Sequence, residues 1–555
     1  MNLNLRLIII VCLLLYAGNR NKGVFSSSEA GEPAEQDELI VELENLGNIR
    51  GHILQSAEGK NFYAFQDIPY AEPPIGPNRF RPPKPHGAWE GVLNVTENKK
   101  TCVQVNDPNS VEDCLVLNVY TPVRASPVIS LPVFFWIHGG AFVNGNGSIH
   151  SFNPKFLIDY DIIIVTINYR LGLFGFLTTL DENIPGNLGL KDQLLALKWT
   201  YDHITRFGGD PKKITVGGES AGSMSAGFHL LSKAARGLIT GIIQQSGSPL
   251  SSVLHPTNDR ELAFEFGKSL NKSFTSTKSS DLLELLQQAS YSELMALNNK
   301  FTSGRGVGFM DALTFKPVIE DDNDDAFITE TMHNAVLEGH FNLVPILIGF
   351  NSEESLMFLE ITNNTLVEER AKFLDECSAN LVSQFLNVAE EDKEKLGTIL
   401  KTFYSCSSFT EDKNALIKYT SDEIFIRSTI RQAEAASRYV PVYLYELTWL
   451  PDDSTLLGVP HGTELWYLWD GISLGPVNEI FRKPLLKWWT NFIKYQNPTP
   501  KSDGELQNII WAEVQPDSVK YLDINSQFTV KENPRHYYDF KNLFDLYTRS
   551  PYITY

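Results

Sequence analysis

Short runs that are apolar throughout recur along the chain from Pro132 onward, each ending in glycine or polar residues. The runs are "PVFFWIHGG", "DIIIVTINYR", "KITVGG", "LITGIIQQSG", "VPILIGFN" and "VPVYLYEL". They predict strands that are buried on both faces. A helix that ends near Gly208 is predicted between them, because apolar residues recur there at spacings of 4, 3, 4 and 3. These residues are Leu190, Leu194, Leu197, Tyr201 and Ile204.

The alternation of such strands with helices predicts an α/β fold, with a large, mostly parallel sheet and helices on both faces. Nearer the N-terminus, "LIVELENLGNIRGHIL" and "NFYAFQDIPYA" predict short strands at an antiparallel edge. Length alone favours about three or four domains, although no repeat or Pro/Gly/Ser-rich linker divides the 555 residues.

Composition and charge narrow the class of protein. Hydrophobic residues make up 43% and charged residues 21%, which is typical of globular chains. The excess of 67 Asp+Glu over 47 Lys+Arg gives a formal charge of −20. Because this charge repels phosphate backbones, we expect no nucleic-acid partner.

The N-terminus has the pattern of a secretory signal: Arg6, an apolar run over residues 7–16, then Ala17 and Gly18. We expect residues 1–23 to be a signal peptide and leader, with cleavage near residues 18–23, and the mature chain to span 24–555. No later stretch is long and apolar enough to span a bilayer. The sequence therefore predicts a secreted, extracellular protein with no stable membrane anchor.

Four cysteines lie beyond the predicted signal, and an even number in an exported chain favours disulfides. Local pairing, Cys102 with Cys114 and Cys377 with Cys406, is preferred among the three possible connectivities. Glycosylation sequons also fit export. They begin at Asn94, Asn146, Asn271 and Asn363.

Ser220 lies at the centre of "ITVGGESAGSMSAG", directly after a predicted strand. A Gly-x-Ser-x-Gly turn between a strand and a helix exposes the serine as a nucleophile; the alternative is a chance glycine turn. A serine hydroxyl needs a base and an acid that orients the base. In a strand–turn–helix arrangement these partners follow in the order serine, acid, histidine.

That order leaves two histidines as candidate bases. His461, in the glycine-flanked loop "GVPHGTELW", is favoured over His536 in "NPRHYYDF". Candidate acids Glu353 and Glu354 directly follow "VPILIGFN", and spacing does not choose between them. Reading His461 and Glu464 as metal ligands finds no second histidine. We predict neither a metal nor a cofactor.

Backbone N–H groups for an oxyanion hole are predicted at the end of the strand that begins at Val133. Gly139, Gly140 and Ala141 are small enough there for a substrate to reach the backbone. Ala221, which follows the candidate nucleophile, supplies another N–H. An ordinary glycine turn is the alternative.

Several long motifs, in order from about Gly51 to Tyr547, resemble the type-B carboxylesterases, the branch of esterases that includes the cholinesterases. They are "EDCLVLNVYTP", "HGGAF", "NYRLGLFGF", "GNLGLKDQLLALKW", "FGGDPKKITVGGESAGS", "QSGSP" and "GVPHGTE". The resemblance implies an α/β-hydrolase fold in a single catalytic domain, assigned to residues 24–555.

The resemblance also implies roles. Ser220 is expected to be the nucleophile, His461 the base and Glu354 the acid. The expected oxyanion donors are the N–H groups of Gly140, Ala141 and Ala221.

Cysteines and departures from the family pattern complete the comparison. The resemblance implies the bridge Cys102–Cys114, whereas Cys377–Cys406 rests on parity alone. Two positions depart from the family pattern: Ser355 replaces the usual glycine after the acid, and Ala141 replaces the third glycine of the oxyanion motif.

The loop between Cys102 and Cys114 bears on the substrate class. Cholinesterases carry a choline-binding tryptophan there, but "VQVNDPNSVED" has no aromatic residue. Juvenile-hormone esterases typically have Gln before the nucleophile, where this chain has Glu219. We therefore expect a general carboxylesterase for neutral, fairly apolar esters. A lipase, a hormone- or pheromone-specific esterase and a catalytically idle adhesion or binding relative are the alternatives.

Overall fold

The computed structural model describes residues 39–552, apart from 106, 125–126, 304–312, 358–363, 385, 405–406, 452–453, 472–478 and 551. The predicted signal segment 1–23, Cys406 and the sequon residue Asn363 lie outside the described residues. Among the helices within those ranges, none combines the length and apolar character needed to cross a bilayer.

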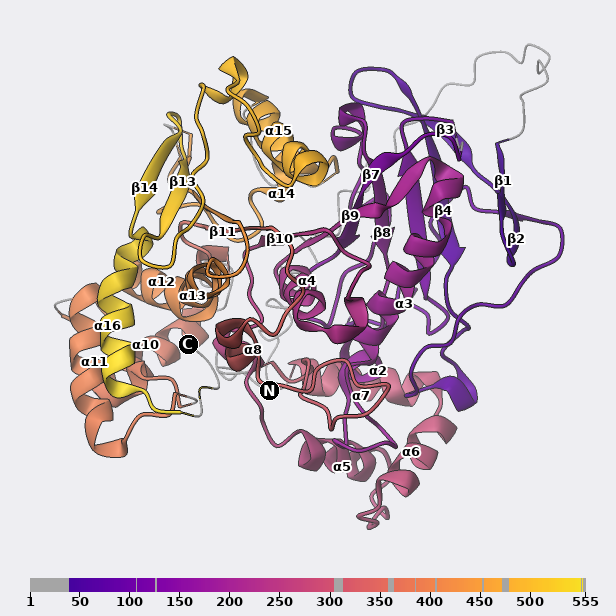
Figure 1. The fold of residues 1–555 in the computed structure, drawn as a ribbon. Helices are drawn as coiled ribbons and strands as arrows, with labels where there is room; N and C mark the ends of the chain where they lie inside the picture. Colours follow the sequence, from indigo (N-terminus) through magenta and orange to yellow (C-terminus); the bar gives the residue numbers. More distant parts are fainter. Residues whose placement is uncertain are drawn as a thin grey trace.

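Eleven strands of the described chain form the central sheet (Figure 1). In spatial order they are β14 (Thr529–Glu532), β13 (Lys520–Ile524), β12 (Val442–Leu447), β11 (Ile346–Asn351), β10 (Gly241–Gln245), β9 (Gly209–Glu219), β7 (Leu131–Ile137), β8 (Ile163–Ile167), β6 (Val116–Thr121), β4 (Asn61–Pro69) and β3 (His52–Gln55). Neighbours from β13 to β8 pair in parallel. The pairs at both edges are antiparallel. The predicted, mostly parallel sheet is confirmed.

The first predicted stretch divides between two sheets. Its beginning forms β1 (Ile40–Leu43) and β2 (Gly47–Arg50), which join β5 (Val92–Asn94) in a small separate sheet. Its end forms β3, which pairs antiparallel with β4 at the edge of the large sheet. The predicted antiparallel edge is therefore present.

Alternate side chains of β7 show why its sequence is apolar throughout. Val133, Phe135 and Ile137 belong to one hydrophobic cluster, whereas Phe134 and Trp136 belong to another. The first cluster includes side chains from α3 (Leu188–His203), α4 (Ala221–Leu231) and α13 (Arg427–Ala436), and the second includes side chains from α15 (Glu479–Tyr495). Because side chains of a strand alternate between its two faces, the strand is buried on both.

The predicted helix is α3, which continues as a short 3-10 turn to Phe207 and ends at Gly208 with a left-handed φ of 87°. Further helices lie in two groups, visible at the bottom and the left of Figure 1. The first group is α2 (Gly172–Phe176), α5 (Asp259–Leu270), α6 (Ser279–Gln288) and α7 (Tyr291–Ser303). The second is α10 (Asn364–Glu376), α11 (Glu390–Tyr404), α12 (Lys413–Ser421) and α16 (Tyr537–Tyr547). Two shorter helices are α8 (Met332–Glu338) and α14 (Leu465–Leu468).

The carboxyl ends of the parallel strands meet along the same edge of the sheet, where α/β proteins bind ligands. β7 ends just before Gly139, and β9 ends just before Ser220. Glu354 follows the end of β11, and His461 lies in the loop beyond β12. Residues far apart in the sequence are thus gathered at one edge.

Candidate active site

Ser220 occupies the sharp turn between β9 and α4 that the sequence predicts. Its backbone has φ 59° and ψ −124°, a strained conformation for a residue with a side chain. The turn is tight: a methyl group on Gly222 would come 2.1 Å from the carbonyl oxygen of Ile137. The Ser220 side chain is half-buried at the end of the strand, as a serine that must meet a substrate requires.

His461 and Glu354 lie in direct contact, with Nδ1 of the imidazole 2.5 Å from Oε2 of the carboxylate. Glu354 is fully buried, and its other oxygen accepts the backbone N–H of Asn351 at 2.7 Å. Glu353 points elsewhere, with Oε1 3.1 Å from Nη1 of Arg535. The geometry thus separates two neighbouring glutamates that spacing did not.

Glu219, the residue before Ser220, reaches the opposite side of the same imidazole. Its Oε1 lies 3.0 Å from Nε2 of His461. Gly139, which follows β7, lies close to Glu219 and Ser220. A methyl group on Gly139 would lie 2.7 Å from Oε2 of Glu219 and 3.1 Å from Cβ of Ser220. Glu219 therefore lies close to both the loop of His461 and the segment at Gly139, beside the turn that carries Ser220.

Buried carboxylates set the charge of the site. Burial raises the pKa of Glu219 to about 8, although the nearby His461 opposes the shift. Burial lowers the pKa of His461, but Glu219 and Glu354 outweigh it and raise the value to about 9. Burial also raises the pKa of Glu464, whose Oε2 accepts from Nδ2 of Asn351 at 2.6 Å. The site therefore favours the imidazolium form of His461.

Of these carboxylates, sequence reasoning assigned a role only to Glu354. Glu464 entered as a possible metal ligand, and Glu219 as a difference from the juvenile-hormone esterases. Both lie in the motifs that carry Ser220 and His461, so proximity to a motif is the signal that could have identified them. Within the described residues, no group of three or more His, Cys, Asp or Glu side chains is arranged to hold a metal ion.

The oxyanion motif has an unusual backbone. Gly140, Ala141 and Phe142 have successive φ values of 104°, 52° and 61°, and a methyl group on Gly140 would come 2.2 Å from the carbonyl oxygen of Asn144. The left-handed region costs about 1–2 kcal/mol for a residue with a Cβ, so Ala141 holds a conformation that glycine adopts more readily. Ala221 begins α4, and a first-turn N–H has no carbonyl partner within the helix.

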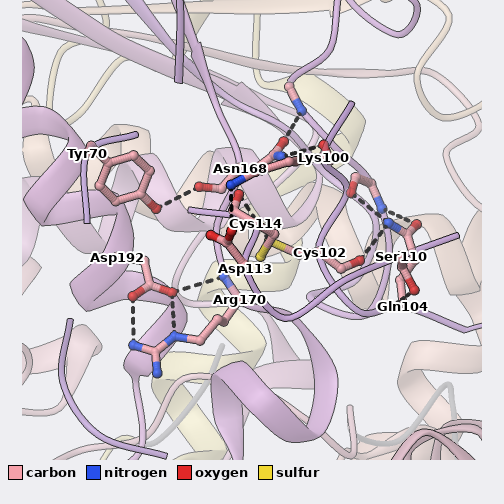
Figure 2. The surroundings of a disulfide bond; sticks show 12 residues. Tyr70, Lys100, Cys102, Gln104, Ser110, Asp113, Cys114, Asn168, Arg170 and Asp192 are labelled. Atoms are coloured by element: carbon pink, nitrogen blue, oxygen red, sulfur yellow. Dashed lines mark hydrogen bonds and ion pairs between the residues drawn. A yellow bond between two sulfur atoms is a disulfide. The ribbon is translucent and has the colours of Figure 1, made fainter. Parts of the chain in front are cut away.

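The predicted bridge Cys102–Cys114 is confirmed, with an S–S distance of 2.03 Å (Figure 2). Gln104 lies within the loop that this bridge closes. Its side chain donates to the carbonyl of Gly145 and accepts from the N–H of the same residue, both at 3.1 Å. Because Gly145 follows the oxyanion motif closely, the disulfide loop supports the backbone of the site.

The second predicted bridge, Cys377–Cys406, involves a residue outside the described ranges; within those ranges, Cys377 is exposed and its thiol is free. The Cys377 thiol donates a hydrogen bond to Oε2 of Glu394 at 2.9 Å. Cys406 lies outside the described residues. Parity of the cysteine count was the sole reason for this pairing, and parity carries no geometric information.

The described sequon residues differ in accessibility. Asn94 and Asn271 are exposed. Asn146 is half-buried, and its Oδ1 accepts from the N–H of Ser148 and the hydroxyl of Ser151, both at 3.0 Å. Surface position favours the first two as glycan acceptors.

The model of the carboxylesterase family matches residues 37–540 of this chain. The chain is 31% identical over 527 residues to the juvenile hormone esterase of Tribolium castaneum, covering 86% of this chain and 87% of that protein. It is 31% identical over 492 residues to venom carboxylesterase-6 of Apis mellifera, covering 82% and 86% of the two chains. The crystal structure of juvenile hormone esterase from Manduca sexta superposes with a TM-score of 0.79 and 26% identity, covering 92% of this chain and 99% of the other.

The chain therefore belongs to the carboxylesterase family and has the α/β-hydrolase fold. As a member of that family it is a carboxylic ester hydrolase of type B.

Proposed function

We propose that this protein is a secreted serine carboxylesterase that hydrolyses neutral, fairly apolar esters through an acyl-enzyme on Ser220. The observation that carries the proposal is the 2.5 Å contact between His461 Nδ1 and Glu354 Oε2. That contact leaves Nε2 on the side of the ring away from Glu354, where it lies 3.0 Å from Oε1 of Glu219, the residue before Ser220. Glu354 acts as the orienting acid and His461 as the general base.

In the first half-reaction, Nε2 of His461 takes the proton from Oγ of Ser220 while Oγ attacks the ester carbonyl carbon. The N–H groups of Gly140, Ala141 and Ala221 bind the oxygen on which negative charge develops. His461 then gives its proton to the departing alcohol oxygen, and the carbon–oxygen bond breaks. Water, deprotonated by the same imidazole, hydrolyses the acyl-enzyme and restores Ser220.

One aromatic ring beside the base supports an apolar substrate. The ring of Phe425 packs against that of His461, with centroids 4.5 Å apart. In the loop closed by Cys102 and Cys114, the described side chains Gln104 and Ser110 make polar contacts within the protein. With no aromatic residue in that loop, a quaternary ammonium lacks the face it would need there.

Export is supported by chemistry as well as by the N-terminal pattern. The bridge Cys102–Cys114 is of the kind that persists in oxidising compartments. The relative from Apis mellifera is named as a venom esterase. We accordingly propose cleavage of the leader near residues 18–23 and extracellular activity of the chain from residue 24 onward.

A hormone ester is a second candidate, favoured by the likeness to two proteins named juvenile hormone esterase. Glu219 speaks against it, since the sequence pattern of those esterases has Gln at this position. Comparing kcat/KM for a nitrophenyl or naphthyl ester with that for a long-chain apolar methyl ester separates the two. A strong preference for the methyl ester would favour the second candidate.

The central experiment is covalent labelling of Ser220. An organophosphate should add one adduct per chain, found by mass spectrometry on the peptide that contains Gly218–Gly222, and Ser220→Ala should abolish both the adduct and esterase activity. Labelling elsewhere, or full activity of Ser220→Ala, would refute the mechanism and favour an idle relative or a different nucleophile. A choline ester preferred tenfold or more over its uncharged isostere, about 1.4 kcal/mol of specific recognition, would refute the substrate class.

A further inference from the structure

Both neighbours of Glu354 are fastened to the same short segment. Ser355, on one side, donates its N–H to Oγ of Ser421 at 3.0 Å and its hydroxyl to the carbonyl of Ile417 at 2.7 Å. Glu353, on the other side, pairs with Nη1 of Arg535 at 3.1 Å. Arg535 also donates from Nε to Oδ1 of the residue after Ser421, Asp422, at 3.0 Å. The acid is thus flanked by two tethers that converge on adjacent residues.

Ser421 and Asp422 lie where α12 passes into a π-turn, Asp422–Ile426, that leads into α13. A π-turn widens the helix by one residue per turn, and such turns are frequent at functional sites. Phe425, on this turn, packs its ring against that of His461 at 4.5 Å. The end of α12 and the π-turn that follows it therefore contact the base directly, through Phe425, and hold the acid through its neighbours.

Most side chains of this assembly are buried. Ser355 and Ser421 are fully buried, and Asp422 is nearly so. The second oxygen of Asp422 accepts the hydroxyl of Tyr404 at 2.8 Å. A methyl group on Gly458 would come 2.2 Å from Cγ of Glu353, so the histidine loop also packs closely against this assembly. Buried polar contacts with satisfied partners hold a unique geometry better than exposed ones.

We propose that the junction between the end of α12 and the π-turn Asp422–Ile426 holds Glu354 and His461 in register, with Ser355 and Arg535 as its positioning residues. The proposal rests on the proposed function, because it assigns these residues to the acid and base of that mechanism. Ser355 is also the position at which this chain departs from the family's glycine. The serine hydroxyl adds a tether that a glycine cannot make.

The test compares Ser421→Ala, Ser355→Ala and their double variant, with kcat expressed per active site titrated by an organophosphate. Since misplacement of about 1 Å can cost on the order of a hundredfold, we expect a loosened loop to lower kcat about tenfold, with KM nearly unchanged. The double variant should lose little more than the larger single loss, because the two hydroxyls lie 3.0 Å apart and share the carbonyl of Ile417 in one network. Ser421→Thr, which keeps a hydroxyl, should retain the kcat of the wild type.

The pH profile provides a readout that a general loss of stability would not move. Glu219, Glu354 and Glu464 all raise the pKa of His461 against its burial. Loosening Glu354 weakens one of these effects, so the acid limb of kcat/KM should shift to lower pH in the alanine variants. Arg535→Lys, which replaces a two-armed guanidinium with one ammonium, should shift it in the same direction.

Thr490→Val is the matched control. Thr490 is buried in α15, and its hydroxyl donates to the carbonyl of Leu486 four residues earlier at 2.7 Å, as Ser421 donates to Ile417 at 2.8 Å. It should lower thermal stability without moving the pH profile. The inference would be overturned if the wild type depends on Ser220 and the alanine variants have the same kcat per active site and the same acid limb as the Thr490→Val control. A wild type without Ser220-dependent activity would overturn the proposed function, and this inference with it.

Discussion

Nε2 of His461 lies 3.0 Å from Oε1 of Glu219, the residue that precedes the proposed nucleophile. The same imidazole contacts Glu354 through Nδ1, so a carboxylate faces each ring nitrogen. Burial alone would lower the pKa of the histidine, yet the carboxylates raise it to about 9. Glu219 thus competes for the proton that a general base must be free to accept and return.

The first prediction concerns pH. His461 acts as a base only when neutral, so activity should rise as pH increases through its pKa, and the acid limb of kcat/KM should lie above the ordinary value of about 6.5. Glu219→Gln removes a negative charge beside Nε2. The imidazolium then becomes less stable, its pKa falls, and the limb should move to lower pH.

Glu42→Gln provides the control for this comparison, because it removes the same charge from an exposed position on β1. Its profile should match that of the wild type. A flat profile between pH 5 and 9 in the wild type would contradict a histidine base, and an unmoved limb in Glu219→Gln would contradict the role given to Glu219.

The second prediction separates two adjacent acids. Glu354→Gln should keep the fold but lower kcat by about 10⁴, the effect expected when an acid that orients the histidine becomes an amide. Glu353→Gln weakens the contact with Arg535 instead, so it should lower the free energy of unfolding by about 2 kcal/mol and kcat no more than about tenfold. Steady-state kinetics and urea unfolding measure the two effects, and the reverse pattern would exchange the residues' roles.

The third prediction tests the oxyanion motif. Gly140→Ala places a methyl group where the carbonyl of Asn144 lies 2.2 Å away, at a φ of 104°. The displaced N–H groups should lower kcat by about 10²–10³, the loss typical of one oxyanion donor. Gly59→Ala is the control, since Gly59 has φ 75° with nothing nearby. It carries the backbone strain without the collision and should leave kcat unchanged.

The fourth prediction concerns the disulfide. Replacing both Cys102 and Cys114 with alanine releases a short loop and should lower the free energy of unfolding by about 3 kcal/mol. Because Gln104 in that loop is hydrogen-bonded to Gly145, we also expect kcat to fall, by less than in Gly140→Ala. Gln104→Ala, in a chain that keeps the disulfide, should lower kcat by a similar factor but lower the free energy of unfolding by less. Equal stability of the double alanine variant and the wild type would contradict this account.

Periodicity predicted the strands and α3 well. A strand buried on both faces is an apolar run, and a helix buried on one face has apolar residues at helical spacing, so both patterns are visible in the local sequence. The turn at Ser220 and the contact of His461 with Glu354 were also anticipated, the latter only through resemblance to a family. The role of Glu354 could not follow from spacing, since Glu353 is as close to β11 in the sequence. What separates them is Arg535, which lies far along the chain.

Contacts made by tertiary packing escaped the sequence altogether. The local sequence does not show that Glu219 is buried or that Phe425 contacts His461, because a Glu or Phe at the surface has the same local sequence pattern as a buried one. The pairing of Cys377 could not be derived from the sequence for the same reason, since the partner of a cysteine depends on distances in the fold. The chain length also gave a wrong expectation of about three or four domains, because one large sheet and its helices take up most of the chain.

The order of the strands bears on how the enzyme matures. The proposed site draws on the ends of β7, β9 and β11 and on the loop beyond β12, and Arg535 adds a contact from near the C-terminus. Parallel strands pair only after long crossovers close, and such pairing is slow. A nascent chain therefore has no working site until nearly all of it has left the ribosome. During refolding, recovery of hydrolysis should lag behind burial of Trp136 in the sheet, which makes activity a late clock for assembly.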